Sequence, residues 1–268
     1  MVGKARFQPP HKVSNSLVNS ALFAHVINGH SKIYAPVKSV ELFTGDSLIM
    51  KCDNFVNNWF PNQDNSFTEV IIFELEPETL EYIYDNHLPD FLQKPTIAET
   101  SSLKRIPPNE MLIRFAKEIS HYIDHPQLMK EELLKVKTRE LIFLLMQVDH
   151  DASIKGILST LFNHNDYNFK QIIEAHIFEN LNLEDLAFMA GLSLSSFQRK
   201  FKALYKTTPR KYINSKRLDR ARNLLAKPDV RIKEIAYSCG FQDVAYFSNA
   251  FSAAFSTSPS DYRKKLLK

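Results

Sequence analysis

Short apolar runs separated by polar residues characterise the chain from Val2 to Glu76. The runs LFAHVI, KIYAP, VELFTG, SLIM and EVIIFEL each have the length of a β-strand and lie between turn-forming residues. Several short strands at such close spacing are typical of an antiparallel sheet or barrel. The pattern therefore predicts an antiparallel β-barrel in this part of the chain.

Apolar residues then recur at helical spacing in residues 77–84, 109–122 and 128–147. The last of these segments carries a leucine stripe, which consists of Leu133, Leu134, Leu141, Leu144 and Leu145. Such a stripe can pack on the chain's own barrel, or it can pair two copies of the chain. A connector of residues 149–165 follows, with some helical character at 154–162.

The last hundred residues contain an internal repeat, in which Leu186-Ala187 followed by Gly191 recurs as Ile235-Ala236 followed by Gly240. At an offset of 50 residues a second pattern recurs: Phe197, Phe201, Tyr205, Pro209 and Tyr212 match Phe247, Phe251, Phe255, Pro259 and Tyr262. Each copy predicts a short helix, a turn that begins at glycine, and a second helix with one buried aromatic stripe. The chain therefore contains helix-turn-helix geometry twice.

Capping residues mark the ends of these helices. Asn182 can cap a helix that begins at Leu183, and the pairs Thr208-Pro209 and Ser258-Pro259 each place a hydroxyl before a proline at the first helical position. One helix of residues 209–226, about 27 Å long, is expected to join the two copies.

Composition narrows the class of protein. The 268 residues are enough for two domains, and 44% hydrophobic residues allow each domain a core. Cys52 and Cys239 match neither a zinc-ligand spacing nor a disulfide framework, which favours a reduced, cytosolic protein. No apolar stretch has the length of a membrane span, and no signal peptide is recognised, so membrane insertion and secretion are not expected.

The net charge of +4 is unevenly divided along the chain. Residues 169–268 hold 18 Lys+Arg against 9 Asp+Glu, a net charge of +9, whereas residues 1–168 hold 16 against 21, a net charge of −5. A basic end on an acidic remainder is consistent with a polyanion-binding module, but also with a merely solvated lysine-rich surface. The helix-turn-helix repeat decides in favour of nucleic acid.

The segments LEDLAFMAGLSLSSFQRKFKALYKTTPRKYINSKRLDRARNLL and IKEIAYSCGFQDVAYFSNAFSAAFSTSPSDYRK resemble the DNA-binding domain of AraC/XylS-type bacterial transcription regulators. The resemblance covers residues 166–268 without a gap, and it implies that a rigid helix joins two helix-turn-helix units whose recognition helices enter successive major-groove segments. The chain is thus expected to be an α+β protein. Residues 1–148 would form a cupin-like antiparallel β-barrel with flanking helices, residues 149–165 a linker, and residues 166–268 an all-α DNA-binding domain.

Two recognition helices, residues 194–205 and 243–255, supply the candidates for DNA contact. Gln198 and Arg199 match the family's base-reading positions, and these side-chain types can bond adenine and guanine respectively. The outer face of the second helix holds no Lys or Arg, so a looser base preference is expected there, and Asp243 is expected to cap that helix. The base-contacting candidates are Ser195, Ser196, Gln198, Arg199, Val244, Ala245, Tyr246 and Asn249. The phosphate-contacting candidates are Lys200, Lys202, Lys206, Lys211, Lys216, Arg217, Arg231 and Ser248.

The N-terminal segment LFTGDSLIMKCDNFVNNW resembles the cupin-like sensor domain often found before this DNA-binding domain. Asn57 and Asn58 stand where paired histidines of a metal cupin would be expected, and His25 and His30 lack the spacing of a metal set. No metal, cofactor or catalytic residue is therefore expected. Trp59 is as readily a core residue as a ligand-lining one, and so is Phe60.

The family resemblance also implies partners. Helices at the position of the leucine stripe pair two chains in the family, so a homodimer through the five leucines is expected. The protein is expected to bind promoter DNA in the bacterial cytoplasm, to work with RNA polymerase, and to be an activator rather than an enzyme. Its input is an unknown small molecule or, as in the type III secretion activators that its helical arrangement and length resemble, a partner protein. A cupin-type enzyme and a non-specific nucleic-acid binder, whose affinity depends on salt alone, are the alternatives.

Overall fold

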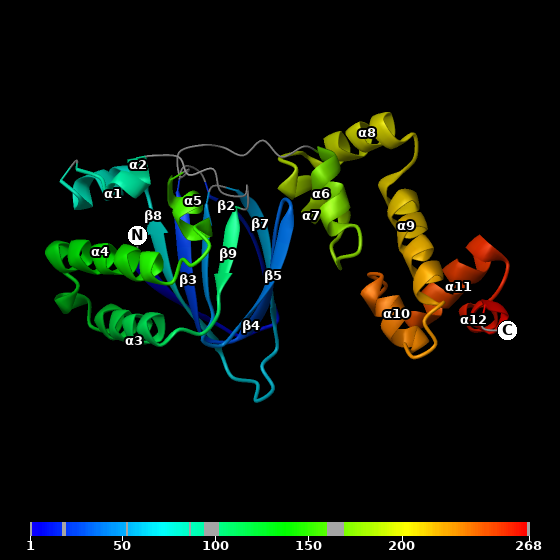
Figure 1. Ribbon diagram of the computed structural model, residues 1–268, viewed down its shortest axis with the longest axis horizontal. Helices are drawn as coiled ribbons and strands as arrows, with labels where there is room; N and C mark the ends of the chain where they lie inside the picture. The colour runs from blue at the N-terminus through cyan, green and yellow to red at the C-terminus, as the bar shows by residue number, and fades with distance from the viewer. Residues whose placement is uncertain are drawn as a thin grey trace. The chain divides into compact units, whose positions relative to one another are not determined.

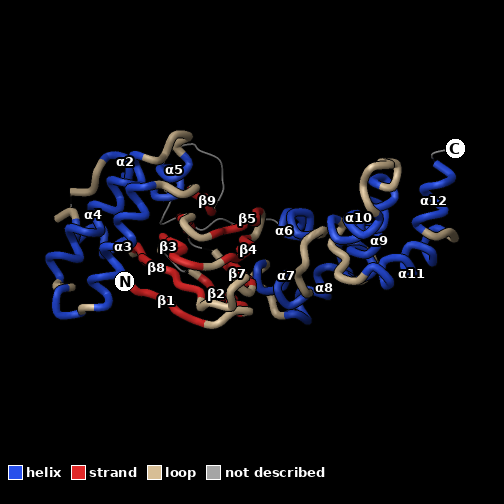
Figure 2. Tube along the Cα trace, turned by 90° about the horizontal axis from the view of Figure 1, so that it is seen from below, coloured by secondary structure: helices blue, strands red, loops and turns tan. Residues whose placement is uncertain are grey.

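The chain divides into two compact units, Met1–Tyr167 and Asn168–Lys268, in the computed structural model. The structure describes residues 2–17, 20–51, 53–85, 87–93, 102–159 and 169–266, and Cys52 lies outside this set. Strands and helices together build the first unit, whereas the described residues of the second unit form helices and the turns between them (Figure 1, Figure 2).

Two antiparallel sheets form the strand layer of the first unit. One has the strand order β1-β8-β3-β6-β9 and the other the order β2-β7-β4-β5. In chain order the strands are β1 Val2–Phe7, β2 His11–Ser16, β3 Ala21–Asn28, β4 His30–Ala35, β5 Lys38–Phe43, β6 Ser47–Lys51, β7 Asn54–Phe60, β8 Thr68–Leu75 and β9 Leu103–Ile106. The expectation of an α+β protein with antiparallel N-terminal strands is confirmed, and the likeness to a cupin stays a prediction.

An apolar cluster lies between these two sheets. It includes Ile33 from β4, Trp59 from β7 and Val70 from β8, which are 2%, 7% and 4% exposed. Because side chains alternate along a strand, Phe60 points to the other face of β7, where it is 37% exposed. Trp59 is therefore a core residue and Phe60 a surface residue.

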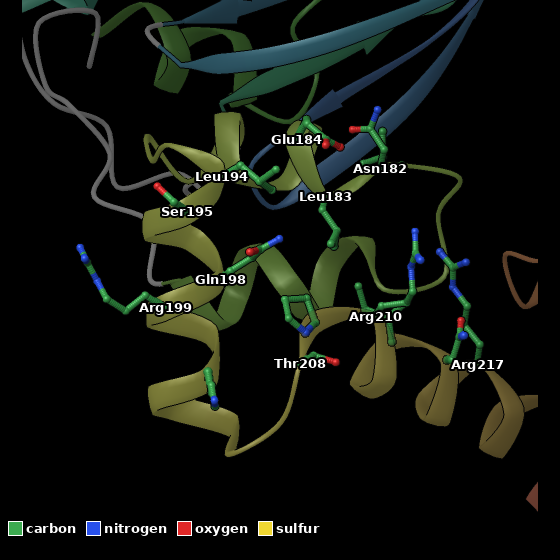
Figure 3. A pocket seen from close by; sticks show the side chains of 15 residues that line it. Asn182, Leu183, Glu184, Leu194, Ser195, Gln198, Arg199, Thr208, Arg210 and Arg217 are labelled. Carbon is green, nitrogen blue, oxygen red and sulfur yellow. The ribbon is translucent and has the colours of Figure 1, made fainter.

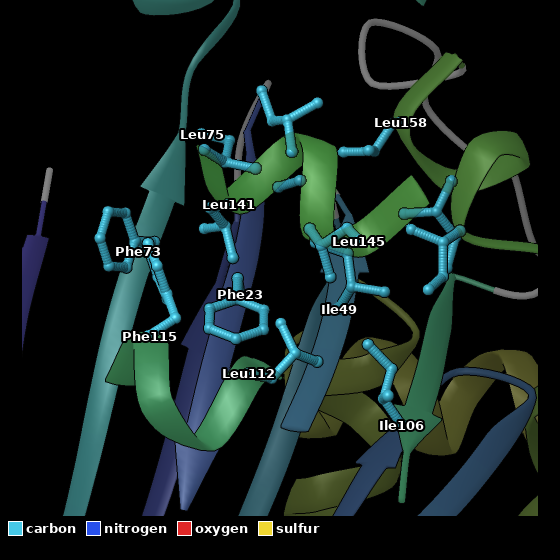
Figure 4. Close-up of a cluster of buried hydrophobic side chains, with 14 of the residues drawn as sticks. Phe23, Ile49, Phe73, Leu75, Ile106, Leu112, Phe115, Leu141, Leu145 and Leu158 are labelled. Atoms are coloured by element: carbon cyan, nitrogen blue, oxygen red, sulfur yellow. The ribbon is translucent and has the colours of Figure 1, made fainter. Parts of the chain in front are cut away.

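Helices cover the other face of the five-stranded sheet (Figure 1). They are α1 Pro77–Ile83, α2 Asp90–Gln93, α3 Glu110–Asp124, a 3₁₀ turn Pro126–Leu128, α4 Glu131–Gln147 and α5 Ser153–Ser159. Their apolar sides meet Phe23 and Phe73 of the sheet in a second cluster (Figure 4), in which the rings of Phe73 and Phe115 lie 5.7 Å apart.

The leucine stripe of α4 packs largely into this second cluster. Leu141 and Leu145 are fully buried there, and Leu134 and Leu144 pack against it from partly buried positions. The expectation that the stripe pairs two chains is therefore corrected for Leu141 and Leu145, which the apolar cluster of their own chain buries. Leu133 is half-buried and is not part of the cluster.

The segment expected to be a linker begins with a helix that belongs to the first unit. Ile154, Ile157 and Leu158 of α5 are at most 3% exposed and join the same apolar cluster. The carboxylate of Asp149 caps this helix by accepting hydrogen bonds from the backbone amides of Ile154 and Lys155, at 3.0 and 2.7 Å. Residues 153–159 are thus core rather than connector, and residues 160–165 lie outside the described residues.

The second unit contains α6 Phe169–His176, α7 Leu183–Met189, α8 Leu194–Tyr205, α9 Pro209–Leu224, α10 Ile232–Ser238, α11 Val244–Phe255 and α12 Pro259–Leu266. Asn182 caps α7 as expected: its side chain accepts a hydrogen bond from the Asp185 amide at 2.8 Å, and the Asp185 carboxylate accepts one from the Asn182 amide at 3.2 Å. Thr208 caps α9 by accepting from the Lys211 amide at 3.4 Å.

The internal repeat of the sequence is reproduced in space. The ring centroids of Phe201 and Tyr212 lie 5.5 Å apart, and those of their counterparts Phe251 and Tyr262 lie 5.6 Å apart. Equivalent backbone positions also have left-handed dihedrals, with φ of +64° at Gly191 and +86° at Gly240. Two copies of one helix-turn-helix unit therefore flank α9.

Candidate nucleic-acid interface

Helix α8 presents a polar face because its aromatic stripe is buried. Phe197 and Phe201 are fully buried, which leaves Gln198 and Arg199 exposed on the opposite side. The side chain of Ser193 caps the helix by accepting from the Ser196 amide at 3.3 Å. The first recognition helix therefore has a fixed start and a fixed rotation about its axis.

The serines near the start of α8 form a small hydroxyl cluster. The Ser193 hydroxyl lies 3.1 Å from the hydroxyl of Ser195 and 3.1 Å from that of Ser196. Ser195 is exposed, whereas Ser196 is half-buried. Of the two serines expected to contact bases, only Ser195 has an exposed side chain.

A groove of about 920 Å³ lies between the start of α7, the outer face of α8 and the first turns of α9 (Figure 3). Four of its side chains are cationic and one is acidic, so the groove attracts anions. The lining residues are Leu181, Asn182, Leu183, Glu184, Leu194, Ser195, Gln198, Arg199, Lys202, Thr208, Pro209, Arg210, Ile213, Asn214 and Arg217. Three sequence-predicted base contacts, Ser195, Gln198 and Arg199, are thus brought to one concave surface.

Gln198 and Arg199 both line the groove, and Figure 3 shows that they leave α8 in different directions, Gln198 toward Leu183 and Arg199 on the other side of the helix. Sequence reasoning missed Arg210 and Asn214, which the first turns of α9 bring to the same groove. The available signal was the Thr208-Pro209 start, because it places residue 210 in the first turn of a new helix beside α8.

The lysines expected to contact phosphate are distributed over several surfaces. Lys202 lines the groove, whereas the Lys200 ammonium lies 5.1 Å from the ring centroid of Phe169, on the side of α6. Lys216 lies 5.6 Å from the ring centroid of Tyr212. Lys206, Lys211 and Arg231 are exposed. Ser248 is half-buried, and its hydroxyl donates to the Val244 carbonyl at 2.8 Å.

Arg217 differs from the expectation of a phosphate contact. Its Nε donates to the Ile177 carbonyl at 2.8 Å, its Nη1 to the Gly240 carbonyl at 2.8 Å, and its Nη2 to the Glu179 carbonyl at 2.6 Å. Burial lowers the pKa of this guanidinium from its usual value. All three nitrogens are engaged by the protein itself, so we correct this assignment to a structural role.

The second recognition helix, α11, offers a smaller polar surface. Asp243 caps it as expected, since its carboxylate accepts a hydrogen bond from the Tyr246 amide at 2.6 Å. Val244 is half-buried and packs against the core that contains Phe247 and Phe251. Ala245, Tyr246 and Asn249 are exposed.

Among the described residues there is no group of three or more His, Cys, Asp or Glu side chains placed to hold a metal ion. His25 is buried, its Nδ1 lies 2.8 Å from the Ser47 hydroxyl, and burial lowers its pKa to about 4. His30 stacks on Phe43 with ring centroids 4.5 Å apart. Over the same described part of the chain, no helix has the length and apolar character needed to cross a bilayer.

Two family models match the chain. Residues 186–265 match a helix-turn-helix domain, and residues 21–157 match the ExsA N-terminal regulatory domain. The HTH-type transcriptional activator RhaS of Enterobacter sp. (strain 638) is 35% identical over 132 residues, which are 47% of this chain and 46% of RhaS. RhaS of Salmonella schwarzengrund (strain CVM19633) is 35% identical over 134 residues, 48% of this chain and 46% of that protein. The chain thus matches about half the length of these curated relatives.

A solved structure is similar over nearly the whole chain. Unsaturated fatty acid bound wild-type ToxT from Vibrio cholerae strain SCE256 is 17% identical, with a TM-score of 0.42, and the match covers 98% of this chain and 94% of ToxT.

Proposed function

The chain belongs to the AraC-type family of transcription regulators, with an N-terminal half of the ExsA regulatory type, and from this premise we propose that it binds promoter DNA and activates transcription with RNA polymerase. The groove between α8 and α9 is the observation that carries the proposal. It combines exposed base-reading side chain types with cations on one concave surface.

Direct readout is assigned to the exposed side chains of the two recognition helices. On α8, Gln198 suits adenine and Arg199 suits guanine, each with a discrimination of about 1–3 kcal/mol against a wrong base. On α11, Ala245 can meet a thymine methyl group, and Asn249 can bond adenine. Because no cation stands on the outer face of α11, we expect the DNA element beneath it to be less strictly defined.

The sequence-independent part of the affinity is assigned to the exposed cations of the second unit. Lys202 and Arg210 in the groove are the strongest candidates for phosphate contacts, together with Lys206, Lys211 and Lys216 outside it. Each phosphate contact that is removed should lower the slope of log K against log salt concentration by about one.

The test is selection of bound duplexes from a random DNA pool by the purified full-length protein at physiological salt. Enrichment of a site with two short elements about one helical turn apart is the expected result. Retention without enrichment would instead identify a non-specific binder. A stoichiometric amount of a transition metal in the purified protein would instead support the alternative that the chain is a cupin-type enzyme.

The input of the first unit is a small molecule bound between the two sheets. Three side-chain oxygens that face this space, Ser31 Oγ, Asn57 Oδ1 and Thr68 Oγ1, are buried and have no hydrogen-bond partner among the described residues. An unpaired buried polar atom costs about 1–3 kcal/mol, so a polar ligand that met these atoms would gain their hydrogen bonds. A compound screen by thermal shift tests this, and Asn57→Leu should abolish the response to any compound found.

A partner protein is the second candidate input. Such a partner could bind the exposed face of the four-stranded sheet. On this face Phe43 and Phe60 are 44% and 37% exposed, and their rings flank the ring of His30. Phe43→Ser should weaken regulation by such a partner and leave a small-molecule response unchanged.

Homodimerisation is assigned to the outer face of α4, not to its buried leucines. Val136 and Phe143 are 58% and 62% exposed and lie two turns apart on one side of the helix, with half-buried Leu133 beside them. Large apolar side chains exposed at this spacing suit a helix of a second copy.

A further inference from the structure

The two helix-turn-helix units touch through two short backbone segments. The segment that follows α6, residues 177–180, meets the turn between α10 and α11 at residues 240–242. Arg217, in the middle of α9, bonds both segments at once: the carbonyls of Ile177 and Glu179 belong to the first, and the carbonyl of Gly240 to the second. One side chain therefore joins the two helix-turn-helix units to each other and to α9, the helix between them.

The two segments lie so close together that there is no room for a side chain at residue 240. A Cβ atom at Gly240 would lie 2.6 Å from the Phe178 carbonyl oxygen and 2.9 Å from the Arg217 guanidinium. The backbone at Gly240 also has φ of +86°, a conformation that other residues rarely adopt. At the edge of the same contact, Gln242 donates a hydrogen bond from its side-chain amide to that of Asn180.

Arginine is the side chain that this arrangement requires. The three carbonyls lie around one planar guanidinium, and each of its nitrogens donates to one of them. A lysine ammonium is a single point donor and cannot span all three positions. The guanidinium is half-buried, so the loss of this side chain would leave three partly buried carbonyls without its donors.

We propose that Arg217 is a positioning residue that fixes the separation and relative rotation of recognition helices α8 and α11, and that it thereby sets how many base pairs may lie between the two DNA elements. The inference rests on the proposed function, because it requires both helices to read DNA. One added base pair moves the second element by about 3.4 Å and turns it by about 34° around the duplex axis. A rigid pair of helices accepts one spacing, whereas a loosened pair accepts several.

The experiment uses the site enriched by the wild-type protein, with the spacer between its two elements shortened or lengthened by one or two base pairs. Affinities of full-length wild type, Arg217→Lys and Arg217→Met are measured on each duplex by fluorescence anisotropy. Wild type should prefer its own spacer by about tenfold or more over the neighbouring spacers, and both variants should reduce that preference to about twofold. Base preference within each element should persist in both variants.

A phosphate contact by Arg217 predicts a different result. Arg217→Met would then lose affinity equally at every spacer, Arg217→Lys would recover it, and the spacer preference would stay as in wild type. That outcome would overturn the proposal. Arg222→Met is the matched control, because Arg222 is an exposed arginine of the same helix that bonds neither segment.

A further variant tests the proposal in case the Arg217 variants do not fold. Gln242→Ala removes only the bond to Asn180 at the exposed edge of the contact, and it should broaden the spacer preference in the same direction as Arg217→Met, to a smaller extent. If the Arg217 variants do not fold, an unchanged spacer preference in Gln242→Ala would count against the proposal. Failure of the proposed function would look different, since wild type would then enrich no two-element site at all.

Discussion

The side-chain amide of Asn214 donates a 2.9 Å hydrogen bond to the hydroxyl of Tyr246. Asn214 lies on α9 and lines the groove beside α8, whereas Tyr246 lies on the exposed face of α11. Helix α9, which joins the two helix-turn-helix units, thus holds a side chain of the second recognition helix in place. A tyrosine that is held before DNA arrives loses less conformational freedom on binding than a free one.

Asn214→Ala and Tyr246→Phe should therefore have similar and non-additive effects. Each should weaken binding to the selected site by about fivefold, which corresponds to about 1 kcal/mol for one hydrogen bond, and the double variant should be no weaker than either single variant. Anisotropy titrations of the four proteins form the required double-mutant cycle. Additive losses would show that the two side chains act on DNA independently.

Arg199→Ala and Lys216→Ala should change different properties of DNA binding, the first the base preference and the second the overall affinity. Arg199→Ala is expected to relax preference at one base position by about 1–3 kcal/mol, because an exposed arginine of α8 is placed to bond a base edge. Lys216→Ala is expected to weaken binding to all sequences alike and to lower the salt slope by about one. Repeating the selection with each variant at two salt concentrations separates these effects, and equal losses on all sequences from both variants would refute the role of Arg199.

The burial of the aromatic residues in the second unit could be predicted from the sequence because their pattern occurs twice. Phe201 and Phe251 recur at an offset of 50, and a buried stripe at helical spacing leaves each recognition helix only one way to face. Arg217 could not be placed in the same manner. Its partners are backbone carbonyls, which every residue has, so a charged residue on a basic helix gives no sign that it is turned inward.

The first unit shows the same limit at α4. Periodicity identifies residues that share a face, but Leu141 and Leu145 on one side and Val136 and Phe143 on another are all apolar. Only the positions of the neighbouring helices and of the sheet decide which side is buried. Strand β9 was not predicted, since the run LKRI is short and half of it is basic.

Substitutions on the two sides of α4 should separate stability from assembly. Leu141→Ala is expected to lower the free energy of unfolding by about 2–5 kcal/mol, because the fully buried leucine leaves a cavity. Phe143→Glu is expected to leave stability unchanged and to abolish the dimer, because Phe143 is 62% exposed in a single chain. Thermal unfolding and sedimentation velocity measure the two quantities, with Gln147→Glu as an exposed charge control on the same helix. A Phe143→Glu protein that sediments as wild type would exclude this face as the dimer contact.

His25 and Asp53 are two buried titratable groups of the first unit, and their contributions to the pH dependence of stability should have opposite signs. Burial lowers the pKa of His25 from 6.5 to about 4, so between these values the unfolded chain binds a proton that the folded chain does not. Stability from this group is therefore complete above about pH 6.5 and is lost as the pH falls toward 4. Burial raises the pKa of Asp53 from 3.8 to about 7, so the folded chain binds the extra proton, and stability from this group increases as the pH falls through the same range.

The two contributions should largely cancel in the wild-type protein between about pH 4 and pH 7, and Asp53→Asn should expose the contribution of His25. Relative to wild type, that variant should lose about 2–4 kcal/mol of stability on acidification across this range, because a neutral amide no longer gains from taking up a proton. Urea unfolding at several pH values gives the required difference curve, in which the groups common to both proteins cancel. His25→Gln should tilt the curve in the opposite direction, since only Asp53 then titrates there. If both variants follow the wild-type curve, these two groups do not hold the shifted pKa values that their burial implies.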